Sequence, residues 1–314
     1  MFPSLVITMS TEPSYFLENI HTEGIQQKRS SGSLTPRASS VELLVSGALS
    51  GAIAKTAIAP MDRVKILFQT DSRRVFSAQN CAKLGREIYA KAGIAGFWKG
   101  HTATLVRVVP YSATNYFVFA RTRELLEVNI GSLVHPIGIK FLAGALSGSC
   151  AVCVSYPLET LRARLAVDLD VKYSGGYWQA VMSIARADGL TSLYAGLRPT
   201  LIGIIPYAGT SFAVYETFKR ENTYCERLAI GAFAGFLAQA ATYPLDVVRR
   251  RMQVSPVSNP SFLGTLRRIY MDEGIKRGLY KGLSMNAVKG PIAVGISLNA
   301  NDYMKEYFAN RHLP

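Results

Sequence analysis

The sequence predicts an all-α membrane protein in which six transmembrane helices form three tandem, pseudo-symmetric repeats. The first observation behind this prediction is a motif, Pro-x-acid-x-x-base, that occurs three times, with its prolines 97 and 87 residues apart. The motif begins at Pro60, Pro157 and Pro244. Self-similarity at a regular spacing is the signature of a repeat architecture, so it decides the overall fold before any local pattern is considered.

The second observation is a pair of glycine landmarks that accompany each proline motif in the same order. Thirteen residues before each proline a Gly-x-x-x-Gly pair begins, at Gly47, Gly144 and Gly231. Downstream, an aromatic-x-Gly element recurs at Trp98–Gly100, Tyr194–Gly196 and Tyr280–Gly282. Small residues let neighbouring helices approach closely in a membrane. Three landmarks that recur in one order are not expected by chance.

The third observation is a set of apolar stretches whose lengths approach the roughly 20 residues that span a bilayer core. They lie at 41–60, 137–157, 197–218, 226–244 and 283–300. Several carry an isolated charge near the middle, which fits helices with one face on lipid and another on a polar interior. The alternative, the buried core of a soluble protein, does not account for the triplicate pattern.

Each repeat is predicted to contain a long helix, a short surface helix and a second long helix. We expect a disordered tail over 1–40, then repeats over 41–129, 130–222 and 223–314. The tail has neither the pattern of a secretory signal nor the Arg-rich, acid-poor composition of a transit peptide. The expected helices are 41–71, 76–91 and 100–127, then 137–167, 177–187 and 197–220, then 226–253, 262–271 and 283–309. Six spanning helices place both termini on one side.

Composition and charge indicate an anionic partner. The 314 residues include 35 basic and 21 acidic side chains, which gives a net charge of +14. Such a charge fits nucleic acid, anionic lipid or an anionic small molecule. Because the basic residues are dispersed and there is no nucleic-acid motif, we do not expect nucleic acid. The four cysteines, the four histidines and the other polar residues form no recognisable metal site or catalytic set, so we expect neither cofactor, metal nor enzyme.

The charges of the proline motifs predict a closed ring of ion pairs. Charged residues inside spanning helices are costly and normally face an interior, where they pair. Under threefold symmetry the acid of one repeat reaches the base of the next. The predicted pairs of this Pro-motif ring are Asp62 with Arg162, Glu159 with Arg249, and Asp246 with Lys65. Gln69 and Gln253, four residues after a base, are expected to hydrogen-bond across the pairs, whereas the third such position is Ala166. Local pairing or solvation at helix ends is the alternative.

A second, incomplete ring is predicted on the even-numbered long helices. Twenty residues after Gly100, Gly196 and Gly282 stand Ala120, Glu216 and Asp302. Each is followed at the third residue by a base: Arg123, Lys219 and Lys305. This even-helix ring lacks one acid and should hold more weakly than the Pro-motif ring. Two rings at opposite ends of one cavity are the arrangement that alternating access requires.

Taken together, these motifs resemble those of the mitochondrial carrier family over residues 41–310. The resemblance implies a threefold six-helix bundle, a multi-pass protein of the inner mitochondrial membrane with both termini facing the intermembrane space. It also implies that the Pro-motif ring is the matrix gate and the even-helix ring the cytoplasmic gate. Three departures are visible: Ala92 replaces the usual acid before Gly93, Ala120 breaks one pair, and one residue is inserted between Gly274 and Gly282.

The substrate class is predicted from positions inside the cavity. Arg107, Gly203 and Lys289 lie at one depth, thirteen residues before Ala120, Glu216 and Asp302. Arg and Lys supply donors suited to phosphates. Gly203-Ile204 resembles the small-plus-aliphatic pair that family members place against adenine, and Tyr207 would stack nearby. Lys55 adds a further positive charge. The alternatives are a snorkelling base for Lys55 and plain helix packing for Gly203.

Three stretches resemble the coenzyme A carriers of the family most closely: 55–60, 107–111 and 278–291. ADP/ATP carriers share the first stretch, but their triple-Arg, triple-Met sequence is here Arg249-Arg250-Arg251-Met252-Gln253. We therefore predict a monomeric carrier of coenzyme A, or of a related adenine nucleotide such as 3′,5′-ADP, that exchanges it for adenine nucleotides. Membrane lipids, with cardiolipin among the candidates, are its other expected partners. The alternatives are an ADP/ATP or ATP-Mg/phosphate carrier and a non-transporting membrane scaffold.

Overall fold

The computed structural model describes residues 40–131, 133–169, 176–218, 224–255 and 261–311, and these residues are almost entirely helical. The predicted tail, apart from Ser40, lies outside the described residues. The chain forms two compact units. The larger unit is Ala59–Ala287, and the smaller one combines the chain up to Ile58 with the chain from Val288 onward.

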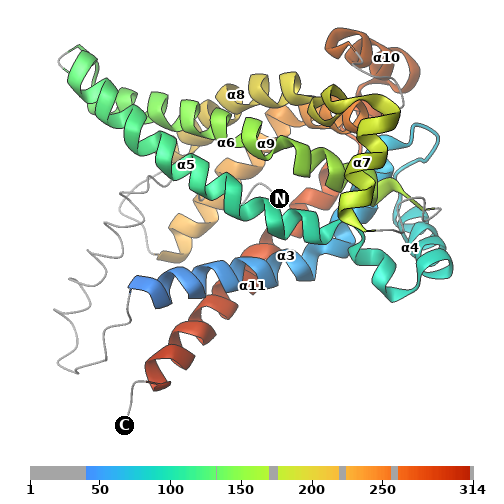
Figure 1. The fold of residues 1–314 in the computed structure, drawn as a ribbon, viewed down its shortest axis with the longest axis horizontal. Helices are drawn as coiled ribbons and strands as arrows, with labels where there is room; N and C mark the ends of the chain where they lie inside the picture. The colour runs from blue at the N-terminus through green and yellow to red at the C-terminus, as the bar shows by residue number, and fades with distance from the viewer. Residues whose placement is uncertain (1–39, 132, 170–175, 219–223, 256–260, 312–314) are drawn as a thin grey trace. The chain divides into compact units, whose positions relative to one another are not determined.

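Six long helices carry the architecture, two from each repeat (Figure 1). They are α3 (Ser40–Thr70), α5 (His101–Ile130), α6 (Pro136–Val167), α8 (Leu197–Phe218), α9 (Tyr224–Val254) and α11 (Leu283–Arg311). The shortest, α8, has 22 residues. At about 1.5 Å of rise per residue, about 20 residues suffice to cross a bilayer core. On length and composition alone, one described stretch, Gly138–Val167, qualifies as a membrane span. The predicted fold class, six long helices in three repeats, is confirmed.

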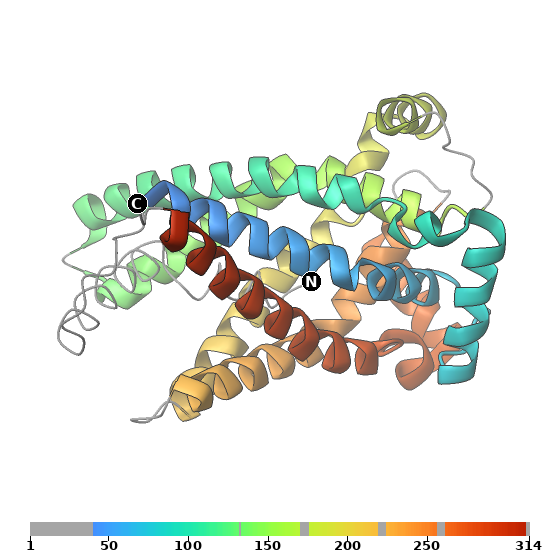
Figure 2. The same ribbon diagram turned by 90° about the horizontal axis from the view of Figure 1, so that it is seen from below.

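Neighbouring repeats meet through long helices that lie side by side. Helix α5 of repeat 1 packs along α6 of repeat 2, and α8 of repeat 2 packs along α9 of repeat 3. In the smaller unit, the part of α3 up to Ile58 and the part of α11 from Val288 onward lie next to each other, as Figure 2 shows from below. Each long helix contains one proline beyond its first turn: Pro60, Pro110, Pro157, Pro206, Pro244 and Pro291. Proline removes a backbone donor and disturbs the helix at that point.

A short helix follows the first long helix of each repeat: α4 (Ala78–Ala92) follows α3, α7 (Tyr177–Asp188) follows α6, and α10 (Phe262–Gly274) follows α9. Ser77 and Ser261 cap α4 and α10, because their side chains accept hydrogen bonds from the backbone of Asn80 and Gly264. A five-residue helical turn follows each short helix. It is a 3-10 helix in repeats 1 and 2 but a π-helix, Ile275–Leu279, in repeat 3. The wider turn accommodates the residue inserted before Gly282.

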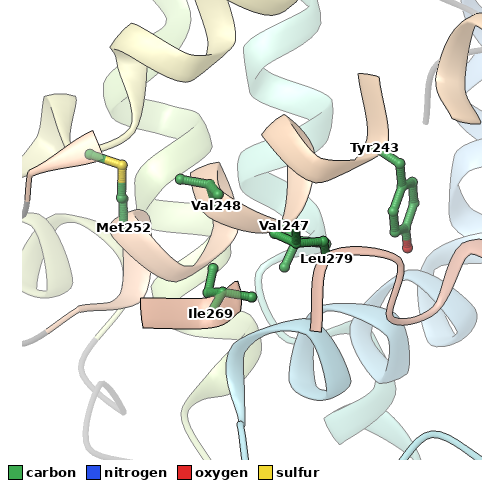
Figure 3. Packing of buried hydrophobic residues seen from close by; sticks show 6 residues of the cluster. All are labelled: Tyr243, Val247, Val248, Met252, Ile269 and Leu279. Atoms are coloured by element: carbon green, nitrogen blue, oxygen red, sulfur yellow. The ribbon is translucent and has the colours of Figure 1, made fainter. Parts of the chain in front are cut away.

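Apolar clusters fix each short helix beneath the long helix of its own repeat. Each cluster contains an isoleucine five residues before the glycine that ends the short helix: Ile88, Ile184 and Ile269. In repeat 3, Ile269 packs with Val247 and Val248 of α9 and with Leu279 (Figure 3). All four side chains are less than one-tenth exposed. This burial positions the turn that leads into the second long helix.

Candidate functional site

The Pro-motif ring is present at two of its three predicted pairs. A guanidinium nitrogen of Arg162 donates to a carboxylate oxygen of Asp62 at 2.9 Å, and Arg249 forms an ion pair with Glu159. Both pairs join consecutive repeats, and all four side chains are less than one-tenth exposed. The third pair, Asp246 with Lys65, stays a prediction. The Lys65 ammonium lies over the ring of Tyr243, 5.2 Å from its centroid.

Glycine at the start of the second long helix permits the contact between repeats at the ring bases. Gly100 and Gly196 adopt positive φ values of 84° and 86°. A Cβ at these positions would lie 3.0 Å from the carbonyl oxygen of Arg162 and 2.9 Å from that of Arg249, respectively. Any other residue would therefore be strained in its backbone and crowded against the next repeat. This close approach explains why the aromatic-x-Gly element recurs.

The two glutamines bind tyrosine hydroxyls, and the side-chain oxygen of Gln253 also accepts a hydrogen bond from Arg250 at 2.9 Å. Their expected contacts across the ion pairs stay a prediction. The amide of Gln69 donates to Tyr243 at 3.0 Å, and that of Gln253 donates to Tyr156 at 3.2 Å. These tyrosines immediately precede the motif prolines of repeats 3 and 2, so their hydroxyls stand where the glutamine of another repeat reaches. At the remaining interface, by the same symmetry, Ala166 corresponds to the glutamine and Ala59 to the tyrosine.

A third set of contacts between repeats was not predicted. An arginine of each repeat donates from Nε to a backbone carbonyl of the next. The bonds run from Arg63 to Ala166 at 2.9 Å, from Arg164 to Gln253 at 3.0 Å, and from Arg251 to Gln69 at 3.0 Å. All three acceptors are the ninth residue after a motif proline. We call this set the arginine–carbonyl ring.

The donors of the arginine–carbonyl ring differ between repeats. In repeats 2 and 3 the arginine is the seventh residue after proline, and it also binds the acid before the glycine that ends the short helix. These pairs are Arg164 with Asp188 and Arg251 with Glu273. In repeat 1 the two equivalent positions are Leu67 and Ala92. Arg63 donates there instead, and it also bonds the carbonyl oxygens of Gly96 and Asp168. The sequence showed that Ala92 replaces the acid, but the accompanying replacement of the arginine by Leu67 was not predicted.

Lysines add bonds between repeats at two of the three interfaces. The Lys99 ammonium donates to the Asp168 carboxylate at 2.8 Å, and Lys281 donates to the carbonyl oxygen of Asp71 at 2.7 Å. Both lysines precede the glycine of the aromatic-x-Gly element, where repeat 2 has Ala195. Burial lowers the pKa of Lys281, and nearby Glu273 opposes this shift.

The predicted substrate residues fall in both units. Arg107 lies in the larger unit, where its guanidinium donates to Glu159 at 3.0 Å. A Cβ on Gly203 would contact Leu245 of α9 at 3.5 Å, which places this glycine at a helix contact. Ile204 and Tyr207 are buried in the larger unit. Lys289, buried, and Lys55, half-buried, belong to the smaller unit.

The even-helix ring stays a prediction. Arg123 donates to Glu127, four residues along its own helix, at 2.7 Å, a local pair that the sequence interpretation overlooked. Glu216 is exposed in the larger unit, whereas Asp302 and Lys305 are exposed in the smaller one. Lys219 lies outside the described residues.

Comparison with known proteins finds relatives along nearly the whole described chain. The family model described as mitochondrial carrier protein matches three times, over residues 36–129, 134–223 and 220–312. The mitochondrial coenzyme A transporter SLC25A42 of Xenopus tropicalis is 47% identical over 274 residues, which are 82% of this chain and 83% of the relative. Its human counterpart is 46% identical over 276 residues, 83% of this chain and 86% of the relative. The mitochondrial carrier protein CoAc2 of Zea mays is 35% identical, with 84% and 86% covered.

Proposed function

The chain belongs to the mitochondrial carrier family, and from this premise we propose that it transports coenzyme A across the inner mitochondrial membrane. The proposed carrier is a monomer with six spans that exchanges coenzyme A, or a close relative such as 3′,5′-ADP, for adenine nucleotides. Two of its relatives, from frog and human, are named mitochondrial coenzyme A transporters. As a carrier it moves its substrate without chemical change.

One observation of the geometry supports an anionic, phosphate-bearing substrate. Three arginines, Arg107, Arg249 and Arg250, approach a single buried carboxylate, that of Glu159. The positive charge here exceeds the negative charge, in surroundings where burial strengthens electrostatic attraction. Guanidinium groups match phosphate oxygens in geometry as well as charge. A polyanion such as coenzyme A fits this excess.

On the basis of this excess of positive charge, we assign the remaining predicted residues to the route that the substrate follows through the protein. Lys55 and Lys289 would join Arg107 in binding phosphates, while Gly203, Ile204 and Tyr207 would receive the adenine ring. The Pro-motif ring would act as the matrix gate, and its closed pairs support a resting state shut on that side. The even-helix ring would close the cytoplasmic side. Its predicted members are Arg123, Glu216, Lys219, Asp302 and Lys305.

Two other functions compete with this proposal. An ADP/ATP or ATP-Mg/phosphate carrier would use the same positive charge for a different nucleotide. A scaffold would keep the fold without transport, but a scaffold has no need of ion pairs that can open. Ion pairs buried between repeats, such as Asp62 with Arg162, therefore favour a transporter.

Exchange in liposomes tests the proposal directly. The purified protein is reconstituted, loaded with ADP, and offered coenzyme A, 3′,5′-ADP, ADP or ATP outside. We expect coenzyme A to drive release of labelled ADP, and Arg107→Gln to reduce this release at least tenfold. Arg121→Gln is the matched control, because Arg121 lies on the same helix but is exposed. Exchange of ADP and ATP without coenzyme A would indicate a nucleotide carrier, and no exchange at all would indicate a scaffold.

A further inference from the structure

Two buried hydroxyl groups stand on either side of Arg107 in α5. Thr104 is three residues before Arg107 and Tyr111 is four residues after it, which places the three side chains on one face of the helix. Thr104 is 2% exposed and Tyr111 is 7% exposed. Among the described residues, neither hydroxyl has a hydrogen-bond partner. Buried polar atoms rarely stay unpaired in proteins, so these two hydroxyls call for a partner from outside the chain.

The equivalent threonine of repeat 2 shows how such a hydroxyl is satisfied within the protein. Thr104 and Thr200 are both the fourth residue after the glycine that begins the second long helix. The Thr200 hydroxyl donates to the carbonyl oxygen of Gly196 at 2.8 Å and contacts the Tyr156 hydroxyl at 3.2 Å. Repeat 1 has Ala59 at the position of this tyrosine. Within the described chain, the Thr104 hydroxyl forms neither kind of bond.

Arg107 brings a positive charge to the two hydroxyls. Its guanidinium carbon lies over the ring of Tyr111, 5.6 Å from the centroid. Because helical side chains lean toward the N-terminus, those of Arg107 and Tyr111 both lean toward the turn that carries Thr104. A guanidinium has five N–H donors, and the bond from Arg107 to Glu159 at 3.0 Å uses one of them. Hydrogen-bond donors from three side chains therefore face one buried region.

These donors determine which chemical group fits the region. A guanidinium donates but cannot accept, and a hydroxyl can rotate to donate to an anion beside it. A phosphate group presents three strong acceptor oxygens. Since these oxygens point in different directions, one phosphate can accept from a guanidinium and from hydroxyls on neighbouring turns. A low dielectric strengthens each such bond, so a buried site of this kind selects a ligand that carries phosphate.

We propose that the hydroxyls of Thr104 and Tyr111 complete a phosphate-binding site with Arg107 and so contribute to substrate selection. This inference rests on the proposed function and adds two residues to the predicted substrate site. The bound group is a phosphate of the nucleotide, which in coenzyme A is either the 3′-phosphate of the ribose or the diphosphate at the 5′ position. Either one supplies the acceptor that both hydroxyls lack in the described chain.

The experiment removes one hydroxyl at a time and measures affinity and stability on the purified full-length protein. Tyr111→Phe and Thr104→Val should each weaken the Kd for coenzyme A about tenfold, because each loses a hydrogen bond to a charged group. Neither should lower the midpoint of thermal unfolding without ligand, since the hydroxyl that is lost was unpaired. Thr104→Ser keeps the hydroxyl and should keep the Kd. Thr200→Val is the matched control: its hydroxyl has partners, so it should lower the midpoint and leave the Kd unchanged.

Weaker binding without loss of stability is the decisive readout, because a purely structural hydroxyl would not produce it. An unchanged Kd in both variants overturns the inference, as does a loss of affinity that accompanies a loss of stability. Dephospho-coenzyme A, which lacks the 3′-phosphate, distinguishes the two sources of phosphate. The variants should bind it as the unaltered carrier does if the hydroxyls hold the 3′-phosphate, and about tenfold more weakly if they hold the diphosphate.

Failure of the proposed function has a different signature, because the unaltered carrier itself would not bind coenzyme A. The same variants would then be measured with whichever of ADP, ATP and 3′,5′-ADP it binds. Weaker binding of that nucleotide by Tyr111→Phe and Thr104→Val would support the phosphate site without coenzyme A transport. A protein that binds none of these nucleotides would overturn both the proposed function and the site.

Discussion

In repeats 2 and 3, the arginine that reaches the next repeat stands seven residues after proline and binds an acid of its own repeat, whereas repeat 1 reaches its neighbour differently. There, Leu67 replaces the arginine and Ala92 replaces the acid. Arg63, one helical turn earlier, makes the equivalent bond to the carbonyl oxygen of Ala166. Leu67 joins a buried apolar cluster with Phe68, Leu84 and Ile88. Loss of the arginine and loss of the acid belong together, because either group alone would be buried without its partner.

This comparison shows which part of a contact between repeats is fixed and which part can move. The acceptor is always a backbone carbonyl, so it is present whatever side chain stands at that position. Repeat 2 has Ala166 where the other repeats have Gln69 and Gln253, but the backbone carbonyl of Ala166 still accepts the hydrogen bond from Arg63. The donor can come from either of two successive turns, since a long arginine side chain covers the difference. Repeats with unlike sequences therefore bind their neighbours at the same place.

The largest effect is expected from the residue on which repeat 1 depends. Arg63 is 3% exposed and bonds three carbonyl oxygens, those of Ala166, Gly96 and Asp168. Arg63→Ala should cost about 3 kcal/mol or more of stability, because hydrogen bonds to a charged group contribute about 1.5–3 kcal/mol each and buried carbonyls lose their partner. Thermal unfolding of the purified protein measures this loss. Arg121→Ala, at an exposed site of α5, should stay within about 0.5 kcal/mol.

A rescue experiment decides whether the arrangement of repeats 2 and 3 can replace Arg63. Adding Leu67→Arg and Ala92→Asp to Arg63→Ala installs the donor and acid at the positions used by the other repeats. The triple variant should recover about half of the lost stability, since one charged pair and one carbonyl bond return. Leu67→Arg alone should not, because its charge would lack the acid. A triple variant no more stable than Arg63→Ala would mean that the two arrangements are not equivalent.

A smaller loss of stability is expected from the glycine that begins the second long helix of repeats 1 and 2, and the loss should be equal in the two repeats. Gly100→Ala and Gly196→Ala each force a non-glycine residue into a positive φ and bring a Cβ within about 3 Å of a carbonyl oxygen of the next repeat. Each should cost about 2 kcal/mol, from left-handed strain plus crowding. Gly85→Ala is the control, because a Cβ there meets nothing within 4 Å and a helix gains from alanine. Unequal losses at Gly100 and Gly196 would contradict a common packing.

The fold could be predicted from the sequence because its landmarks recur. Each of the nine predicted helices lies within about three residues of an observed one, since proline, glycine and apolar length mark the boundaries three times over. The ion pairs of Asp62 and Glu159 followed from the same symmetry. Side chains at a fixed offset in three repeats must face one another around an axis.

The missed contacts have acceptors or partners that a motif does not display. A backbone carbonyl exists at every residue, so nothing in the sequence marked Ala166, Gln253 and Gln69 as the acceptors of three arginines. The glutamines were assigned to the ion pairs because both lie near the bases. Tyr156 and Tyr243, which bind them, stand outside the motif by one residue and are replaced in repeat 1 by Ala59. Because the symmetry is incomplete at these positions, the sequence did not predict the hydrogen bonds between the glutamines and the tyrosines.

The smallest effect is expected from adding a hydrogen bond between a glutamine and a tyrosine at the interface of repeats 1 and 2, like the two at the other interfaces. We call such a bond a glutamine–tyrosine brace. Ala166→Gln with Ala59→Tyr reproduces the pair that Gln253 forms with Tyr156. In repeat 2 the Tyr156 hydroxyl also contacts that of Thr200 at 3.2 Å. The equivalent Thr104 hydroxyl is buried and, within the described chain, lacks a hydrogen-bond partner. A tyrosine at 59 would supply one.

Because both substitutions enlarge buried alanines, the informative quantity is the interaction energy of a double-mutant cycle rather than the stability of one variant. Ala166→Gln alone buries an unpaired amide and should destabilise by about 1–3 kcal/mol. The double variant should be about 1 kcal/mol more stable than the sum of the single losses predicts, as measured by thermal unfolding. It should also exchange substrate more slowly, since the brace strengthens the closed Pro-motif side. Strict additivity would show that repeat 1 differs from its successors in backbone position, not only in its side chains.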